Sequence, residues 1–278
     1  MNVSSALVAV ALLAAVLPLT AQPLPAQTPA GLADERAEYA RWLASARTSP
    51  FAVIARAPVG TGIRLGPPNS DVPLSGLAER RVTEQAGRVI LESGGATAVR
   101  VIPRGRPVPL GAYTLVASGA SGRTLLSVYG PVRGSRLPTY FPYDSSLSLS
   151  VTLEPHGPGT VRLLAADGTE VDAAEGGSVS VVIGGKSSRL SVRRIPGDDE
   201  ESDLEIYFRD ATNGHGSYPA GRFVTLSPLP DGHYRLDFNR ARNPFCAYSS
   251  AYACPAPWPG NGLSGPVRTG ERYDEGDK

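Results

Sequence analysis

The chain has 278 residues, 41% of them hydrophobic, with 31 glycines and 26 prolines. This apolar content is sufficient for a packed core, whereas glycine and proline are too frequent for a mainly helical protein. Lys and Arg number 27 against 26 Asp and Glu. The chain therefore lacks the basic excess that a phosphate-binding surface requires, and we expect no nucleic-acid partner.

The apolar run near the amino terminus predicts a secretory signal peptide. The run from Ala6 to Leu17 is about 12 residues long, which fits a signal-peptide core and is too short to span a bilayer. Pro18 breaks the run, and the small residues after it favour cleavage after Ala21, with Ala26 as the alternative. No cysteine follows the apolar core, which excludes a lipoprotein anchor.

One feature of this leader argues against export. The first basic residue is Arg36, so a misassigned start site or an uncleaved anchor stays open. We expect a signal peptide over residues 1–21 and a proline-rich extended linker over residues 22–33. The mature chain should then be exported, to the periplasm, the extracellular space or the outer envelope surface, with no stable membrane span.

Residues 34–48 form the one convincing helix in the sequence. Asp34 stands at the expected N-cap, and Glu35 and Glu38 suit the positive end of a helix. Small and apolar residues recur on one face, and Pro50 ends the pattern because the residue before a proline avoids helical geometry. The face is made by Ala37, Ala40, Leu43 and Ala44.

After this helix, apolar residues recur at every second position, which predicts half-buried strands. The clearest such residues are Leu147, Leu149, Val151 and Leu153, then Val179, Val181 and Ile183, then Leu204, Ile206 and Phe208. Turn dipeptides punctuate them at Asp167-Gly168, Gly176-Gly177, Gly184-Gly185 and Asp231-Gly232. The predicted fold is mainly β, with antiparallel sandwich-like or barrel-like sheets and one N-terminal helix after a signal peptide.

Prolines at 138 and 142 interrupt strand-like sequence and suggest a boundary at residues 140–145. We expect a first β-half over residues 51–140, a second over residues 146–272 and a polar tail over residues 273–278. Whether the two halves share a core stays open.

Motifs of common enzymes are absent. The chain contains no nucleophile elbow, no zincin motif and no phosphate-binding loop, and its three histidines are not at ligand spacing. The acidic run 198–201 lacks the spacing of a calcium loop and is typical of a solvated hairpin tip. We therefore expect no cofactor and no metal site.

Cys246 and Cys254 are the only cysteines. Seven residues separate them, more than the two to four typical of a zinc site, and no other ligands are at hand. In an oxidising compartment a structural disulfide is the favoured interpretation, with metal binding and redox chemistry as alternatives.

Polar residues gather between Phe208 and Asn243. One interpretation is a buried hydrogen-bonded network that holds irregular chain in place. The other is a pocket with catalytic candidates Asp210, His215, Arg222 and Asp237, in which His215 acts as acid or base and an aspartate orients it. The binding candidates are Thr212, Asn213, Tyr218, Asn239, Arg240 and Asn243.

The same residues carry a resemblance to a bacterial family of unknown function, the domain-of-unknown-function 1684 family. Two elements depart from its pattern: Gly260 replaces an expected Glu, and a Gly-Trp-Leu element is missing near residues 48–51. The resemblance implies no established activity. Its matching pieces are Phe208-x-Asp210-x-Thr212-Asn213-Gly214, Tyr218, Gly221-Arg222-Phe223, Asp237-Phe238-Asn239-Arg240-Ala241, Asn243-Pro244-x-Cys246-Ala247-Tyr248, Cys254-Pro255, Asn261-x-Leu263 and Gly270-Glu271.

Two functions stay open. The first is a non-catalytic exported module that binds an unknown small molecule, an envelope component or another protein. The alternative is a hydrolase or lyase that uses the pocket around Asp210, His215, Arg222 and Asp237.

Overall fold

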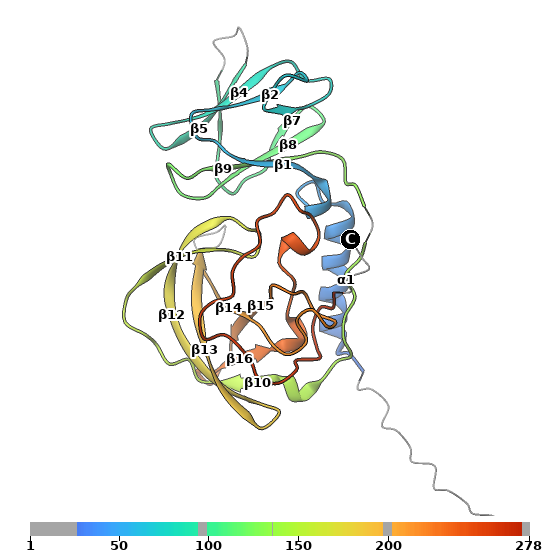
Figure 1. Cartoon of the computed structure of the whole chain (residues 1–278), viewed down its shortest axis with the longest axis vertical. Helices are drawn as coiled ribbons and strands as arrows, with labels where there is room; N and C mark the ends of the chain where they lie inside the picture. The colour runs from blue at the N-terminus through green and yellow to red at the C-terminus, as the bar shows by residue number, and fades with distance from the viewer. Residues whose placement is uncertain (1–26, 94–98, 135, 197–201, 274–278) are drawn as a thin grey trace, which may run out of the picture.

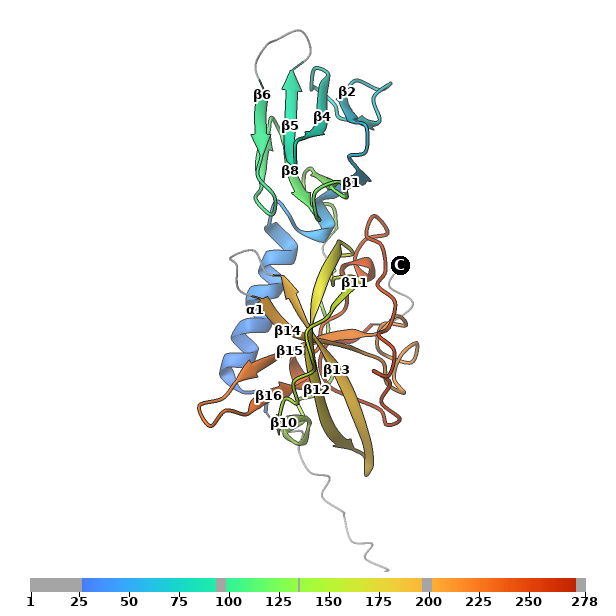
Figure 2. The same cartoon turned by 90° about the vertical axis from the view of Figure 1, so that its left-hand side faces the viewer.

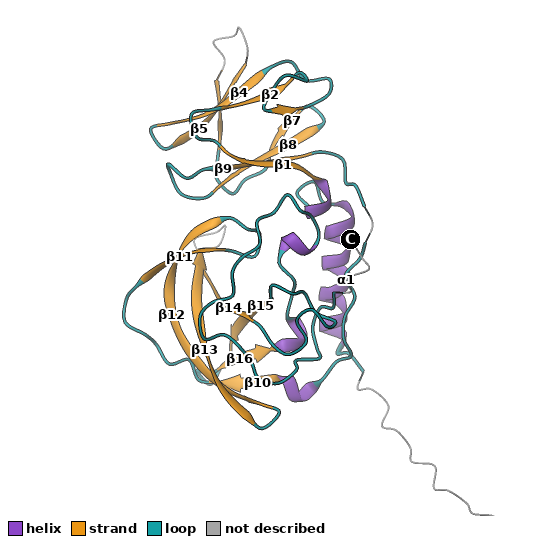
Figure 3. Ribbon diagram, in the orientation of Figure 1, coloured by secondary structure: helices purple, strands orange, loops and turns teal. Residues whose placement is uncertain are grey.

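The computed structural model describes residues 27–93, 99–134, 136–196 and 202–273 (Figure 1). The expected signal peptide, the start of the expected linker, the acidic run 198–201 and most of the polar tail lie outside these residues. The described chain is mainly β, with one α-helix and short 3-10 turns between strands (Figure 3). The prediction of a mainly β fold with antiparallel sheets and one N-terminal helix is confirmed.

The first nine strands form a sandwich of two sheets. A four-stranded sheet has the order β1-β9-β8-β7, and a five-stranded sheet has the order β3-β2-β4-β5-β6. Apolar residues from both sheets pack face to face in one core, among them Leu65, Val82, Leu115 and Val128. The strands are β1 (Val53–Pro58), β2 (Ile63–Gly66), β3 (Val72–Pro73), β4 (Arg80–Gln85), β5 (Arg88–Ser93), β6 (Val99–Ile102), β7 (Val108–Leu110), β8 (Tyr113–Ser118) and β9 (Leu125–Tyr129).

The remaining strands form one seven-stranded antiparallel sheet of order β10-β16-β15-β14-β13-β12-β11. The sheet is open, with β10 and β11 at its edges, so the expected alternative of a closed barrel is wrong for this half. The strands are β10 (Ser148–Val151), β11 (Thr160–Leu164), β12 (Glu170–Ile183), β13 (Lys186–Pro196), β14 (Ser202–Phe208), β15 (Arg222–Pro228) and β16 (Tyr234–Asp237); the 3-10 turns are η1 (Pro50–Ala52), η2 (Ser145–Leu147), η3 (Phe238–Arg240) and η4 (Phe245–Ala247).

Both faces of this sheet carry apolar clusters. One face holds the larger core, which contains the predicted inward residues of β10, β12 and β14, such as Val151, Val181 and Ile206. The other face holds a smaller cluster around Tyr207, Phe223 and Trp258. β14 is thus covered on both faces, although its Asp-Glu-Tyr-Arg alternation is typical of a solvent-facing side. The reason is that the chain after β16 folds back over this face and places Trp258 on it.

The helix α1 (Ala30–Ser45) begins four residues before the expected 34–48 and ends three residues earlier. Asp34 is exposed inside the helix, and the N-cap is Pro29 with no side-chain cap, so the predicted Asp34 cap is wrong. Leu32 is buried, and this packing extends the helix toward the amino terminus. At the other end the hydroxyl of Ser49 donates a hydrogen bond to the Leu43 carbonyl, which satisfies an unpaired helix-end acceptor.

Three of the four predicted turn dipeptides join consecutive strands, and the fourth does not. Gly184-Gly185 links β12 to β13, with both residues at positive φ, as a two-residue type I′ hairpin requires. Gly176-Gly177, in contrast, lies inside β12 at a bulge. A Cβ on Gly177 would clash with the Glu154 carbonyl oxygen, so glycine there permits close approach of a neighbouring segment.

Arg56 joins the sandwich to the seven-stranded sheet. Its side chain is 4% exposed and lies 4.4 Å over the ring of Tyr252. It donates to the Asp167 carbonyl at 2.6 Å and to the Thr169 hydroxyl at 3.0 Å. The two parts are stacked end to end, and α1 runs beside the seven-stranded sheet (Figures 1 and 2).

Candidate functional site

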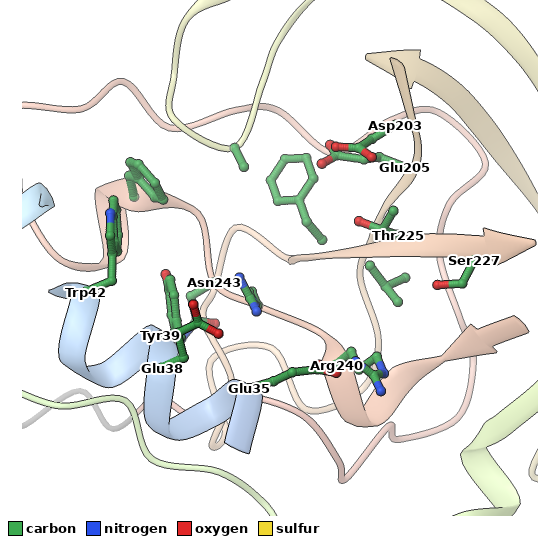
Figure 4. Close-up of a pocket in the computed structure, with 15 residues that line it drawn as sticks. Glu35, Glu38, Tyr39, Trp42, Asp203, Glu205, Thr225, Ser227, Arg240 and Asn243 are labelled. Carbon is green, nitrogen blue, oxygen red and sulfur yellow. Dashed lines mark hydrogen bonds and ion pairs between the residues drawn. The ribbon is translucent and has the colours of Figure 1, made fainter. Parts of the chain in front are cut away.

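A pocket of about 650 Å³ opens between α1 and the seven-stranded sheet (Figure 4). Its volume falls in the range of small-molecule sites. One wall comes from α1, the opposite wall from β14 and β15, and the side from the chain around η3 and η4. The lining residues are Glu35, Glu38, Tyr39, Trp42, Ala166, Asp203, Glu205, Phe223, Val224, Thr225, Ser227, Arg240, Arg242, Asn243 and Phe245.

The helix wall is aromatic. Tyr39 and Trp42 are three residues apart, so they lie on the same side of α1, and their rings stack 5.8 Å apart. The Phe245 ring lies 5.8 Å from Trp42 and continues this wall. The guanidinium of Arg242 lies 4.4 Å over the Tyr39 ring. This wall offers flat apolar surface and π-faces to a ligand.

Glu205 supplies the most unusual group on the opposite wall. It comes from β14, where it pairs with Thr225 of β15, and Asp203 lies two residues away on the same face (Figure 4). Its Oε2 atom is shielded from solvent and accepts no hydrogen bond. Burial, and then the nearby Asp203 and Asp167 carboxylates, raise the pKa of Glu205 to about 7. The Oε2 atom of Glu205 is therefore free to accept a hydrogen bond from a ligand.

Asn243 is the second pocket residue with an unused acceptor. It is 4% exposed, and its Oδ1 atom accepts no hydrogen bond. Its amide nitrogen donates to the Arg272 carbonyl at 3.0 Å, which fixes the orientation of the side chain. Its backbone N–H donates to Glu271 Oε2 at 2.9 Å.

Glu271 lies next to the pocket residue Asn243 and holds it in place. It is 1% exposed and accepts hydrogen bonds from Asn243 and from the Tyr248 hydroxyl. Burial raises the pKa of Glu271 to about 7, although both donors and the Arg242 charge lower it. Gly270 before it is at positive φ, and a Cβ there would stand 2.7 Å from the Phe238 carbonyl. This glycine therefore allows the last segment to reach η3.

The charges on the pocket wall are unequal. Four carboxyl groups line it, those of Glu35, Glu38, Asp203 and Glu205, against the guanidiniums of Arg240 and Arg242. Arg240 forms an ion pair with Glu35, which lowers the pKa of that carboxyl. It also lies 3.3 Å from Asp237. Carboxyl groups therefore outnumber guanidiniums on this wall.

The four predicted catalytic residues do not meet in one pocket. Asp210 and Arg222 form a buried ion pair at 2.9 Å, and both side chains are 0% exposed. Arg222 also donates to the carbonyls of Val267 and Thr269, and Asp210 accepts from the backbone N–H of Thr212. Their charge is thus used to hold the carboxyl-terminal segment on β14 and β15.

His215 and Asp237 lie apart from that pair. His215 is exposed in a turn, with its ring Nδ1 3.2 Å from the Asn213 carbonyl. Asp237 begins η3, where it accepts from the backbone N–H of Asn239 at 3.0 Å and binds Arg240. No carboxylate among the described residues forms an ion pair with His215. This geometry gives a histidine-based acid–base pair no support.

Most of the predicted binding residues stabilise turns. Thr212 and Asn213 bond within the 210–218 turn, and the Tyr218 hydroxyl contacts both sulfurs of the cysteine pair. Asn239 ties η3 to Asp144. Of the ten predicted site residues, Arg240 and Asn243 line the pocket.

Few features of the sequence mark the other pocket residues. The positions of Glu35 and Glu38 suit the amino-terminal end of a helix, and those of Asp203 and Glu205 suit the solvent-facing side of a strand. Neither pattern indicates a pocket. The spacing of Tyr39 and Trp42 was the one available signal of a paired aromatic face. Their partners Phe223 and Phe245 are about 180–200 residues further along the chain, so sequence spacing could not place them together.

Cys246 and Cys254 form a disulfide, with a Cα–Cα distance of 5.5 Å. The favoured interpretation of these cysteines is confirmed. Across the described ranges, no group of three or more His, Cys, Asp or Glu is arranged to hold a metal ion. In the same ranges no helix is both long and apolar enough to cross a membrane.

Residues 137–272 match the family described as "Protein of unknown function (DUF1684)". Over these residues the chain is similar to the DUF1684 family, as the sequence motifs predicted. The match contains the sheet wall of the pocket, from Asp203 to Phe245, whereas the α1 wall precedes it. A solution NMR structure of an uncharacterised protein from Haloarcula marismortui is similar to this chain at 36% identity, over 50% of this chain and 77% of that one, with a TM-score of 0.43. No curated protein matches the chain.

Proposed function

We propose that this protein is a binding module that takes a small molecule into the pocket between α1 and the seven-stranded sheet. The observation that carries the proposal is that two residues lining the pocket, Glu205 and Asn243, each have a shielded side-chain oxygen without a hydrogen-bond partner. A buried polar atom without a partner costs about 1–3 kcal/mol. A ligand that donates to these atoms would recover that free energy on binding.

We propose a non-catalytic role because the catalytic candidates from the sequence lie outside this pocket. Asp210 and Arg222 neutralise each other in the interior, and His215 is exposed. A hydrolase or lyase that uses Asp210, His215, Arg222 and Asp237 together therefore loses its geometric support.

A second candidate is acid–base hydrolysis inside the same pocket. It is favoured by one observation, the pKa of about 7 of Glu205 beside the Asp203 carboxylate. A protonated carboxylic acid next to an ionised one is the arrangement in which one donates a proton while the other stabilises charge. Chemical identity of the ligand after incubation separates the two candidates: a binding module returns it unchanged.

Export remains part of the proposal. The apolar leader and the Cys246–Cys254 disulfide both suit an oxidising compartment. Amino-terminal sequencing of the protein recovered outside the cytoplasm should begin after Ala21 or Ala26. A chain that starts at Met1 and stays in the cytoplasm would contradict export.

The binding proposal is tested by blocking the pocket. Metabolite extracts and compound libraries are screened by thermal shift, since a ligand that binds the native state raises Tm. Thr225→Trp places a large ring at an exposed lining position, and Thr160→Trp makes the same change at an exposed position of β11 outside the pocket. Ligand-induced shifts should disappear in the first variant and persist in the second. Equal shifts in both variants would place binding elsewhere.

A further inference from the structure

We infer that the ligand of this pocket is a small organic amine that binds as a cation and carries a second N–H or O–H donor. This inference rests on the proposed binding function and names the chemistry of its ligand. It starts from the fact that the unpartnered, shielded atoms of two residues lining the pocket, Oε2 of Glu205 and Oδ1 of Asn243, are both acceptors.

The Glu205 end of the pocket suits the ammonium group. Asp203 and Glu205 point into the same region, and the Thr225 hydroxyl is on the strand paired with Glu205 (Figure 4). An ammonium group has three donors and a positive charge, so it can bond more than one of these oxygens while it neutralises the carboxylates. The terminal carboxyl torsion of glutamate is broad and roughly two-fold, so rotation about it can turn either oxygen of Glu205 toward the pocket.

The charge of the pocket wall disfavours an anionic ligand. The four lining carboxyl groups outnumber the two lining guanidiniums, and Arg240 is already paired with Glu35 and Asp237. An anionic ligand would have to approach Glu205, Asp203 and Glu38 with only Arg242 left to attract it. Like charges repel, so such a ligand is disfavoured at this end.

The second donor follows from Asn243. Its Oδ1 can bond only to a donor, because its own amide nitrogen is fixed on the Arg272 carbonyl. Asn243 and Glu205 come from different elements, the chain after η3 and strand β14. A ligand with donors at two positions satisfies both, and the rings of Tyr39, Trp42 and Phe245 along the helix wall contact its body.

The inference is tested by matched pairs of probes that differ only in amine against hydroxyl. The pairs are tyramine and tyrosol, glucosamine and glucose, and 1,4-diaminobutane and 1,4-butanediol. Binding of each to the mature protein is measured by isothermal titration calorimetry at pH 7.5. We expect at least one amine to bind ten times more tightly than its hydroxyl partner. The inference would be overturned if, at concentrations up to 10 mM, none of the amines bound more tightly than its hydroxyl partner.

Two variants locate the effect. Glu205→Gln keeps the shape of the side chain and removes its charge, and should reduce the amine preference at least tenfold. Glu79→Gln makes the same change at an exposed residue of the sandwich and should leave the preference unchanged. Thermal melts establish that both variants fold. If Glu205→Gln does not fold, Thr225→Trp replaces it, and an amine preference that survives in Thr225→Trp would overturn the assignment.

These outcomes are distinct from failure of the binding proposal. Pocket-dependent binding of neutral or anionic compounds, lost in Thr225→Trp, would keep the binding function and reject the amine.

Discussion

Buried charge is used for two purposes in this molecule. Arg222 and Asp210 are paired and fully enclosed, and they connect three segments of chain that have little regular structure between them. Glu205, by contrast, is partly buried, and its shielded Oε2 atom has no hydrogen-bond partner. The first arrangement is typical of a structural network, and the second leaves bonding capacity for something outside the protein.

Removing Arg222 should be strongly destabilising. Arg222→Leu leaves the Asp210 carboxylate buried without its counterion, and breaking such a pair costs about 3–5 kcal/mol. Urea denaturation followed by circular dichroism measures this loss. The control Arg235→Leu removes an exposed arginine of the adjacent strand and should change the free energy of unfolding by less than about 0.5 kcal/mol. Similar effects of the two changes would contradict a structural role for the buried pair.

Glu205 and Glu271 should make stability fall as pH rises. Their pKa values in the folded protein are about 7, above the ordinary value of 4.5. Between these values the folded state binds more protons than the unfolded state, so the free energy of unfolding decreases from pH 4.5 through pH 7. Melting curves at pH 5.5 and pH 8 should show a higher Tm at the lower pH.

The Glu205 contribution to this pH dependence is removed by Glu205→Gln. The difference in Tm between pH 5.5 and pH 8 should shrink in this variant and stay at its original size in Glu79→Gln. An unchanged difference in Glu205→Gln would show that Glu205 titrates as an ordinary surface carboxyl.

At the scale of elements, α1 is the part that makes a pocket out of a sheet face. Its residues Leu32, Tyr39 and Leu43 are buried, and Arg36 donates to the Asn239 carbonyl at 3.0 Å. The helix therefore packs on chain that is about 200 residues away in sequence. Without it, the aromatic wall of the pocket is absent.

Leu43→Ala should loosen this helix. Leu43 is 0% exposed, and a leucine-to-alanine change in a core costs about 2–5 kcal/mol. We expect that loss in denaturant melts, together with weaker ligand binding. Leu137→Ala makes the same change at a residue that is 50% exposed and should cost less than about 1 kcal/mol. Intact binding in a destabilised Leu43→Ala protein would show that α1 is not part of the site.

The disulfide stabilises the irregular chain around η4. Alkylation before reduction should modify neither Cys246 nor Cys254 in the native protein, as judged by mass spectrometry. Closing a loop of this length contributes about 2–3 kcal/mol by restricting the unfolded chain. Reduction should therefore lower Tm, and two thiols free in the native protein would contradict the bond.

What could be predicted from the sequence depends on the range of the interaction. Alternation in β10, β12 and β14 identified inward residues such as Val151 and Ile206, because a strand shows its buried face locally. The second face of β14 could not be predicted, because Trp258 covers it from a distant segment. The same limit applies to the site: Arg240 and Asn243 were identified, whereas Glu205 has no local feature that marks it as buried.

At the scale of the whole molecule, Arg56 is a polar link between the sandwich and the seven-stranded sheet, alongside Arg123, which forms ion pairs with Glu170 and Asp172 of β12. Arg56 contacts Asp167 and Thr169, and Ser118 of the sandwich lies 3.2 Å from the same Thr169 hydroxyl. Separate apolar cores exist on the two sides of this contact. The relative orientation of the two parts should therefore depend on few residues.

Arg56→Ala should uncouple the two parts. We expect calorimetry to show two thermal transitions that separate further than in the unmodified protein, and faster proteolysis within the connection between β9 and η2. Arg64→Ala, an exposed arginine within the sandwich, should leave both measurements unchanged. A single unaltered transition in Arg56→Ala would mean that the contact does not couple the parts.

The central claim, that ligands enter the pocket under α1, is tested most directly by nuclear magnetic resonance. A compound that raises Tm is titrated into isotope-labelled protein, and shifts of backbone amide signals are mapped. We predict shifts concentrated at Glu35–Trp42, at Asp203–Glu205, at Phe223–Ser227 and at Asn243. Shifts confined to the 210–218 turn around His215, or to the sandwich, would contradict the claim.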